Sequence, residues 1–207
     1  MKLKELESYL QEVEVFDKPK IHYEQYTTTP HLTTMVLHAI HSQYDDIEDK
    51  VIADLGCGCG ILSIGASLLG AGCCIGFEID DDAIEIFNHN VEYIEVPNCH
   101  VVRCDVTTGI PDRWNDFFDT VIMNPPFGTR KNGVDIEFLE TAIRMGKVVY
   151  SMHKTSTREY IIKKCRTWQV ECDVIAELKF DLPQTYKFHN KKSVDVHVDV
   201  IKFTRNA

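Results

Sequence analysis

The stretch Val51-Ile52-Ala53-Asp54-Leu55-Gly56-Cys57-Gly58-Cys59-Gly60 joins a short apolar run to three glycines at alternate positions. An apolar run of this length is typical of a buried strand, and residues 61–69 that follow have a helical pattern. Glycines allow the backbone to turn sharply and a ligand to lie against bare main chain. In an open parallel sheet, such a turn borders the crevice in which ligands bind. A tight structural turn is the alternative explanation.

The spacing of these glycines favours one kind of ligand. The pattern is G-x-G-x-G, and neither register gives the G-x-G-x-x-G of dinucleotide-binding loops. A dinucleotide with its pyrophosphate is therefore the poorer match. A smaller ligand that carries an amino-acid end and one nucleoside fits better.

The same order of strand, turn and helix continues along the chain and predicts a mostly parallel α/β sheet with helices on both faces. Thr29 and Pro30 are expected to cap and open a helix that runs to about residue 44. The last two strands have only the loop Asp181–Lys192 between them, so they are expected to pair antiparallel. The predicted helices are 3–14, 30–44, 61–69, 81–93, 136–146 and 156–167, and the predicted strands are 51–55, 73–79, 100–104, 119–123, 148–152, 170–180 and 193–203.

Composition limits the class of protein. The 207 residues are 44% hydrophobic and 26% charged, which is the balance of one globular domain. No apolar run reaches the roughly 18 residues that span a bilayer, and no secretory signal is recognisable, so the eight cysteines are expected to be reduced thiols inside the cell. The net charge of −10 disfavours strong nucleic-acid binding by the chain alone. Residues 104–207, however, carry 16 Lys/Arg against 14 Asp/Glu, which leaves room for a phosphate-contacting face.

Two acids follow later strands. Glu78 lies about 20 residues beyond the glycine turn, where α/β nucleotide folds place a carboxylate for ribose hydroxyls. We assign Glu78 to the ligand, and Asp81 or Asp82 to capping the next helix. Asp105, at the end of the third strand, is positioned to accept a hydrogen bond from an adenine amino group. A solvated loop aspartate is the alternative for Asp105.

The sequence Asn124-Pro125-Pro126-Phe127 directly follows the apolar strand 119–123. Two prolines fix an extended, rigid turn and leave its carbonyls available as acceptors. The Asn124 amide oxygen and the Pro125 carbonyl can together accept both protons of a planar NH2 group. Phe127 offers a face for stacking of an aromatic substrate, which is worth about 1–3 kcal/mol. Catalysis would then rest on positioning and electrostatic matching, without a metal.

The order of glycine loop, acid after strand two, Asp after strand three and N-P-P-F resembles the class I methyltransferases that act on planar nitrogens. More closely, the chain is similar to the methyltransferase-like protein 5 family, the adenine-N6 methyltransferases of small-subunit (18S) ribosomal RNA. The likeness covers nearly the whole chain. It rests on Glu24-Gln25-Tyr26, DLGCGCG at 54–60, MNPPFGT at 123–129, Ser151-Met152-His153-Lys154, and the segments 181–183 and 186–189.

The resemblance implies a Rossmann-like class I methyltransferase fold, S-adenosylmethionine as cofactor and ribosomal RNA as substrate. It also implies a single domain, with residues 1–48 as a helical cap over the cofactor and 49–207 as the catalytic core. A small zinc-binding methyltransferase activator is implied as partner, in a heterodimer along the sheet edge near strand three. The implied locations are nucleus, nucleolus and cytoplasm. The chain departs from the family at Thr27 and Thr29, where proline and arginine are usual.

Site residues follow from the same likeness. Asn124, Pro125, Pro126 and Phe127 are expected to hold the target adenine. The residues expected to contact the cofactor are Gln25, Thr28, Gly56, Cys59, Ile61, Glu78 and Asp105, and we add Asp54 from the glycine motif. Candidate RNA phosphate contacts are His153, Lys154, Lys187, His189, Lys191 and Lys192, for which a solvated charged loop is the alternative. Cys57 and Cys59 lack the second pair that a tetrahedral metal site needs, so we expect no metal.

Two other functions remain open at this stage. A glutamine side-chain amide in a protein is also a planar NH2 group and satisfies the same Asn-Pro acceptors. A catalytically silent cofactor fold could instead serve as a binding scaffold. The basic stretch 187–192 and the whole-chain resemblance favour RNA, whereas the intact N-P-P-F and glycine loop disfavour the scaffold.

Overall fold

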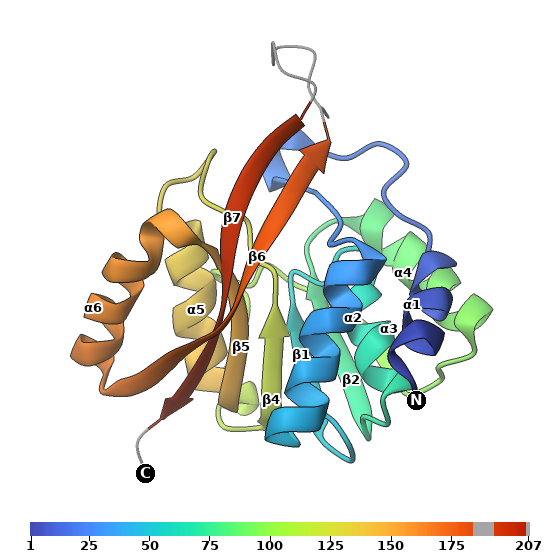
Figure 1. The fold of residues 1–207 in the computed structure, drawn as a ribbon, viewed down its shortest axis with the longest axis horizontal. Helices are drawn as coiled ribbons and strands as arrows, with labels where there is room; N and C mark the ends of the chain where they lie inside the picture. The colour runs from blue at the N-terminus through green and yellow to red at the C-terminus, as the bar shows by residue number, and fades with distance from the viewer. Residues whose placement is uncertain (184–192, 206–207) are drawn as a thin grey trace.

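The computed structural model describes residues 1–183 and 193–205. Seven strands form one sheet in the order β3-β2-β1-β4-β5-β7-β6 (Figure 1). The strands are β1 Val51–Leu55, β2 Cys73–Glu78, β3 Cys99–Arg103, β4 Phe118–Met123, β5 Gly146–Lys154, β6 Val170–Pro183 and β7 Ser193–Arg205. The helices are α1 Leu3–Gln11, α2 Pro30–Ala39, α3 Ile61–Leu68, α4 Asp81–Ile94, α5 Val134–Met145 and α6 Arg158–Trp168, with short turns η1 Ile21–Tyr23, η2 Ile40–Tyr44, η3 Asp112–Trp114 and η4 Thr155–Thr157.

The first five strands pair in parallel, and β7 pairs antiparallel with both β5 and β6. The predicted mostly parallel sheet with an antiparallel C-terminal pair is therefore confirmed. Strand β6 runs further than expected: Asp181 pairs with Asp195 and Pro183 with Ser193. The predicted loop from Asp181 was therefore wrong at its start, because hairpin pairing holds residues 181–183 in the strand.

Each face of the sheet has its own core, since side chains alternate along a strand. Ile52 and Ile122 point to the face covered by α1 to α4, whereas Ala53 and Val121 point to the face covered by α5 and α6. Figure 1 shows the two helix layers on either side of the strands. Helices on both faces, as predicted, leave the carboxyl ends of β1, β2 and β4 open at one edge of the sheet.

The two helices of the N-terminal region pack against helix α3. Helices α1 and α2 contact each other and α3, and Leu6, Leu10 and Leu37 are fully buried there. Helix α2 begins as predicted, with Thr29 Oγ1 accepting from the backbone N–H of Leu32 at 3.3 Å. It ends at Ala39 and continues as the π turn η2 rather than as one helix to residue 44. No described helix is long and apolar enough to cross a membrane.

Candidate active site

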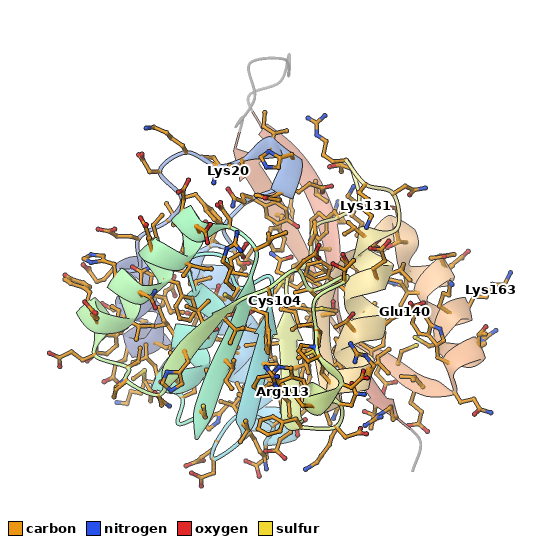
Figure 2. The ribbon with its side chains drawn as sticks, turned by 180° about the vertical axis from the view of Figure 1, so that it is seen from behind. Lys20, Cys104, Arg113, Lys131, Glu140 and Lys163 are labelled. Carbon is orange, nitrogen blue, oxygen red and sulfur yellow. The ribbon has the colours of Figure 1, made fainter. Side chains whose placement is uncertain are left out.

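A cavity of about 270 Å³ lies at the carboxyl ends of β1, β2 and β4. It is lined by Phe16 and residues 22–28, by the glycine turn and the start of α3, by residues at the ends of β2 and β3, and by residues after β4 that extend into α5. Figure 2 shows Lys20 and Lys131 at this end of the sheet, whereas Arg113 lies at the opposite end. The lining residues include Gln25, Thr28, Gly56, Cys59, Ile61, Glu78, Asp105, Asn124 and Pro126, all of which were predicted for the site.

The glycine turn presents bare backbone to the cavity. Gly56, Gly58 and Gly60 all have positive φ, at 69°, 53° and 93°. A Cβ atom on Gly60 would lie 2.6 Å from Cδ2 of Phe87, and one on Gly58 would lie 2.9 Å from Cζ of Phe16. Both the backbone conformation and the available space therefore require glycine at these positions.

Glu78 links β2 to the glycine turn. Its Oε2 accepts the backbone N–H of Gly58 at 2.9 Å, and its Oε1 accepts those of Ile79 and Asp80 at 2.9 and 3.0 Å. Burial raises the pKa of the Glu78 carboxyl above its usual value, although these three donors oppose the shift. A buried carboxylate on the cavity wall can accept hydrogen bonds from ligand hydroxyls.

Asp54 lies behind the glycine turn rather than on the cavity wall. Its Oδ2 accepts the backbone N–H and the hydroxyl of Ser63, at 3.1 and 2.7 Å. It thereby satisfies one of the free N–H groups in the first turn of α3. Burial raises the pKa of Asp54 from its ordinary 3.8 to about 7. The structure thus shows Asp54 supporting the turn, and its contact with a cofactor stays a prediction.

Asp80 is a site residue that the sequence analysis missed. Its Oδ2 accepts from Nε2 of Gln25 at 2.6 Å, and its Oδ1 accepts from Nζ of Lys20 at 2.5 Å. Burial opposes ionisation, but the bonds from Lys20 and Gln25 keep the pKa of Asp80 below its usual value. Asp80 also caps α4 by accepting from the backbone N–H of Asp82. The assignment of this cap to Asp81 or Asp82 was wrong, because both lie inside the first turn.

The side chain of Asn124 has one hydrogen bond and one vacant acceptor. Its Nδ2 donates to Oγ1 of Thr28 at 2.9 Å. Its Oδ1 is buried and has no partner among the described residues. A buried carbonyl without a donor is unfavourable by about 1–3 kcal/mol, so it marks the place where a ligand N–H group is expected.

The Pro125 carbonyl already accepts a hydrogen bond within the protein. Tyr26 Oη donates to it at 3.0 Å, whereas the sequence analysis expected this carbonyl to be available for substrate. A carbonyl has two lone pairs, so one acceptor direction remains. The backbone N–H of Arg130 donates to Glu24 at 2.8 Å, which joins the same N-terminal segment to the loop after Phe127.

The ring of Phe127 is nearly buried and does not line the cavity. Its centroid lies 5.2 Å from that of Tyr26, and Nζ of Lys154 lies 5.7 Å above it. The proposed stacking of a substrate on this face would therefore require Tyr26 or Lys154 to move. Lys154 ends β5 beside the N-P-P-F turn, and its contact with RNA phosphate stays a prediction.

His153 was wrongly predicted as a phosphate contact. Its side chain is 1% exposed, because β5 points it into the core. Its Nε2 lies 2.8 Å from the hydroxyl of Ser151 and its Nδ1 lies 3.7 Å from Oδ2 of Asp135. The remaining candidates Lys187, His189, Lys191 and Lys192 lie outside the described residues.

Cysteine and metal chemistry have little support at this site. Burial raises the pKa of Cys59 to about 12, so the thiol is neutral near pH 7. All eight cysteines are free thiols. Within residues 1–183 and 193–205 no group of three or more His, Cys, Asp or Glu side chains is arranged to hold a metal ion.

Comparisons with known proteins agree with this geometry. Residues 26–125 match the ribosomal protein L11 methyltransferase (PrmA) family. The chain is 59% identical to the rRNA N(6)-adenosine-methyltransferase METTL5 of Danio rerio, over 99% of both chains. It is 51% identical to rRNA N(6)-adenosine-methyltransferase Mettl5 of Drosophila melanogaster, over 98% of this chain and 96% of that one. A crystal structure of a Pyrococcus horikoshii protein, described as a candidate RNA methyltransferase, has a TM-score of 0.88 at 34% identity and covers 100% of this chain and 99% of its own.

Proposed function

Since the chain belongs to the METTL5 family of rRNA N(6)-adenosine methyltransferases, we propose that it methylates N6 of one specific adenine in small-subunit (18S) ribosomal RNA. The adenine lies beside the turn Asn124-Pro125-Pro126-Phe127, of which Asn124 and Pro126 line the cavity. The single observation that carries this proposal is that Asn124 lines the cavity while its Oδ1 is buried without a hydrogen-bond partner in the described chain.

The cavity wall fits S-adenosylmethionine. The bare glycine turn suits the amino-acid end, Glu78 suits ribose hydroxyls, and Asp105 suits the adenine amino group. Asp105 is held for this role, since its Oδ1 accepts the backbone N–H and the hydroxyl of Thr107 at 2.9 and 2.7 Å. Gln25, Thr28, Cys59 and Ile61 complete the proposed cofactor contacts. When bound, S-adenosylmethionine supplies an electrophilic methyl group on a sulfonium.

The protein contributes positioning and electrostatics. Oδ1 of Asn124 accepts one N6 proton of the target adenine, and the free acceptor direction of the Pro125 carbonyl accepts the other. These bonds would draw the nitrogen lone pair out of conjugation with the ring. N6 could then form its bond to the methyl carbon as the methyl–sulfur bond breaks, leaving S-adenosylhomocysteine, and afterwards lose a proton to water. Groups held in place before the reaction need little reorganisation during it. The base has to leave its stack to reach this pocket, which favours an unpaired or weakly paired adenine.

A partner at the β3 edge is part of the proposal. Strand β3 ends the sheet, so its outer backbone groups are unpaired and can accept another strand. Val102 on this strand is 37% exposed. We propose that the small zinc-binding activator docks here, and that the complex acts in the nucleus, nucleolus and cytoplasm. Val102→Lys should abolish co-purification of the activator, whereas an intact complex would contradict this docking site.

The main experiment gives the chain labelled S-adenosylmethionine and either small-subunit ribosomal RNA or a glutamine-bearing release factor, with and without the activator. We expect label in RNA as N6-methyladenine. Asn124→Ala should lose that label but retain cofactor binding, because the substitution leaves the glycine turn, Glu78 and Asp105 in place. Label in protein alone would favour glutamine methylation, and label in neither would favour a binding scaffold.

A further inference from the structure

Two residues of the N-terminal segment hold the two proposed acceptors of the target amine. Thr28 Oγ1 receives the hydrogen bond from Asn124, and Tyr26 donates to the Pro125 carbonyl. Both residues precede α2, nearly one hundred residues before the turn that they contact. The position of the acceptors therefore depends on side chains outside the N-P-P-F sequence.

The orientation of the Asn124 amide is the critical point. An amide can turn by half a rotation and exchange its oxygen with its NH2 group, which have nearly the same size. Only the oxygen can accept a proton from the target amine. With the observed bond from Nδ2 to Thr28, Oδ1 has no partner in the described chain, and Asn124 is a residue of the cavity lining. In the reverse orientation, NH2 would face the substrate amine and repel it.

The Thr28 hydroxyl can select between these orientations because it has a single proton. Within the described chain, the hydroxyl donates that proton to no protein acceptor, and the side chain lines the cavity. A carboxylate of a bound cofactor is an acceptor of suitable chemistry. Once the proton is donated toward the cavity, Oγ1 can only accept from Asn124, and the reverse orientation loses its partner.

We infer that Thr28 is a positioning residue that couples cofactor binding to the orientation of Asn124, and thereby to recognition of the amine on the target base. The inference rests on the proposed function. It goes beyond cofactor contact, because it assigns Thr28 a role in substrate discrimination.

The test compares Thr28→Val with Thr28→Ser, which keeps the hydroxyl. Thr34→Val is the matched control, since Thr34 is fully buried on α2 and does not line the cavity. Adenosine and purine riboside, which lacks the amine, are titrated by NMR at saturating S-adenosylhomocysteine. Saturation keeps the nucleosides out of the cofactor position. We expect a preference of about tenfold for adenosine in the wild type, Thr28→Ser and Thr34→Val, and of less than twofold in Thr28→Val.

Retention of the preference by Thr28→Val, or its absence from the wild type, would overturn the inference. A measurement on the wild type guards against misfolding of the variant: the Asn124 NH2 protons should show a nuclear Overhauser effect to the Thr28 methyl group in the presence of S-adenosylhomocysteine. Its absence would also overturn the inference. Neither measurement requires methyl transfer. A wild type that prefers adenosine over purine riboside but transfers no label to RNA would therefore contradict the proposed function and not the inference about Thr28.

Discussion

Asp80 Oδ2 lies 2.6 Å from Nε2 of Gln25, so the residue that caps α4 also fastens the N-terminal segment beside the cavity. The same carboxylate pairs with Lys20, whose Nζ lies 2.5 Å from Oδ1. Asp80 and Gln25 are both buried, so the bond between them is shielded from water, whereas Lys20 is partly exposed and its ion pair is weaker for that reason. One carboxylate therefore connects the end of β2 to a wall of the cofactor cavity.

Asp80→Asn should weaken binding of S-adenosylhomocysteine by about tenfold without unfolding the chain. Hydrogen bonds to charged groups contribute about 1.5–3 kcal/mol, and only part of this acts on the cavity wall. Calorimetric titration measures the effect. Asp81→Asn is the control, since Asp81 is exposed and, within the described part of the chain, its ion pair is with Arg103 on the surface. Equal affinities of the two variants would show that Asp80 does not organise the cavity.

Gly60→Ala should destabilise the fold more than Gly133→Ala. Both glycines have positive φ, at 93° and 81°, so alanine costs about 1–2 kcal/mol of backbone strain at either position. A Cβ on Gly60 would also clash with Phe87, whereas nothing lies within 4 Å at Gly133. Overpacking adds about 1–3 kcal/mol. Urea denaturation gives both values, and an equal loss would mean that Phe87 can move aside.

Thr34→Val should increase the free energy of unfolding by about 1 kcal/mol. The Thr34 hydroxyl is fully buried and has no hydrogen-bond partner in the described part of the chain. Valine has the same shape and removes the unfavourable burial of that polar group. Thermal or chemical denaturation measures the change. A decrease in stability would imply a partner for the hydroxyl, such as an ordered water.

Asp54 should make stability depend on pH. Its folded pKa of about 7 lies above the ordinary 3.8, so the folded chain binds the extra proton between these values. The free energy of unfolding should therefore fall as pH rises from about 4 to 7, by about 1.4 kcal/mol for each unit between the two pKa values. Asp54→Asn lacks this titration. Parallel stability profiles for the wild type and this variant, measured from pH 4 to 8, would refute the assignment.

Local patterns in the sequence were sufficient for most of the fold. The glycine turn, the N-P-P-F turn and the acid Glu78 follow apolar strands directly, and parallel strands bring such residues to one edge. Thr29 and Pro30 mark the start of α2 because capping depends on neighbouring residues. Features of this kind involve interactions over a few residues, which the order of residues reveals.

Contacts between distant segments could not be predicted in this way. Asp80 is one of three consecutive aspartates, and its bond to Gln25, 55 residues away, distinguishes it from the others, since Lys20 pairs with Asp82 as well as with Asp80. The burial of His153 depends on which face of β5 it occupies. Because the neighbouring Lys154 is also polar, the sequence there shows no alternation of apolar and polar residues that would identify the buried face. The bond from Tyr26 to Pro125 spans 99 residues.

The wall formed by residues 16–28 has a consequence for the order of assembly during translation. Ribosomes deliver the chain from its N-terminus, so this segment emerges well before Asp80, Asn124 and Pro125, to which it is bonded. Until those residues have been synthesised, the segment lacks the partners of these hydrogen bonds. The chain is therefore expected to bind its cofactor only late in synthesis and folding, after β4 has joined the sheet.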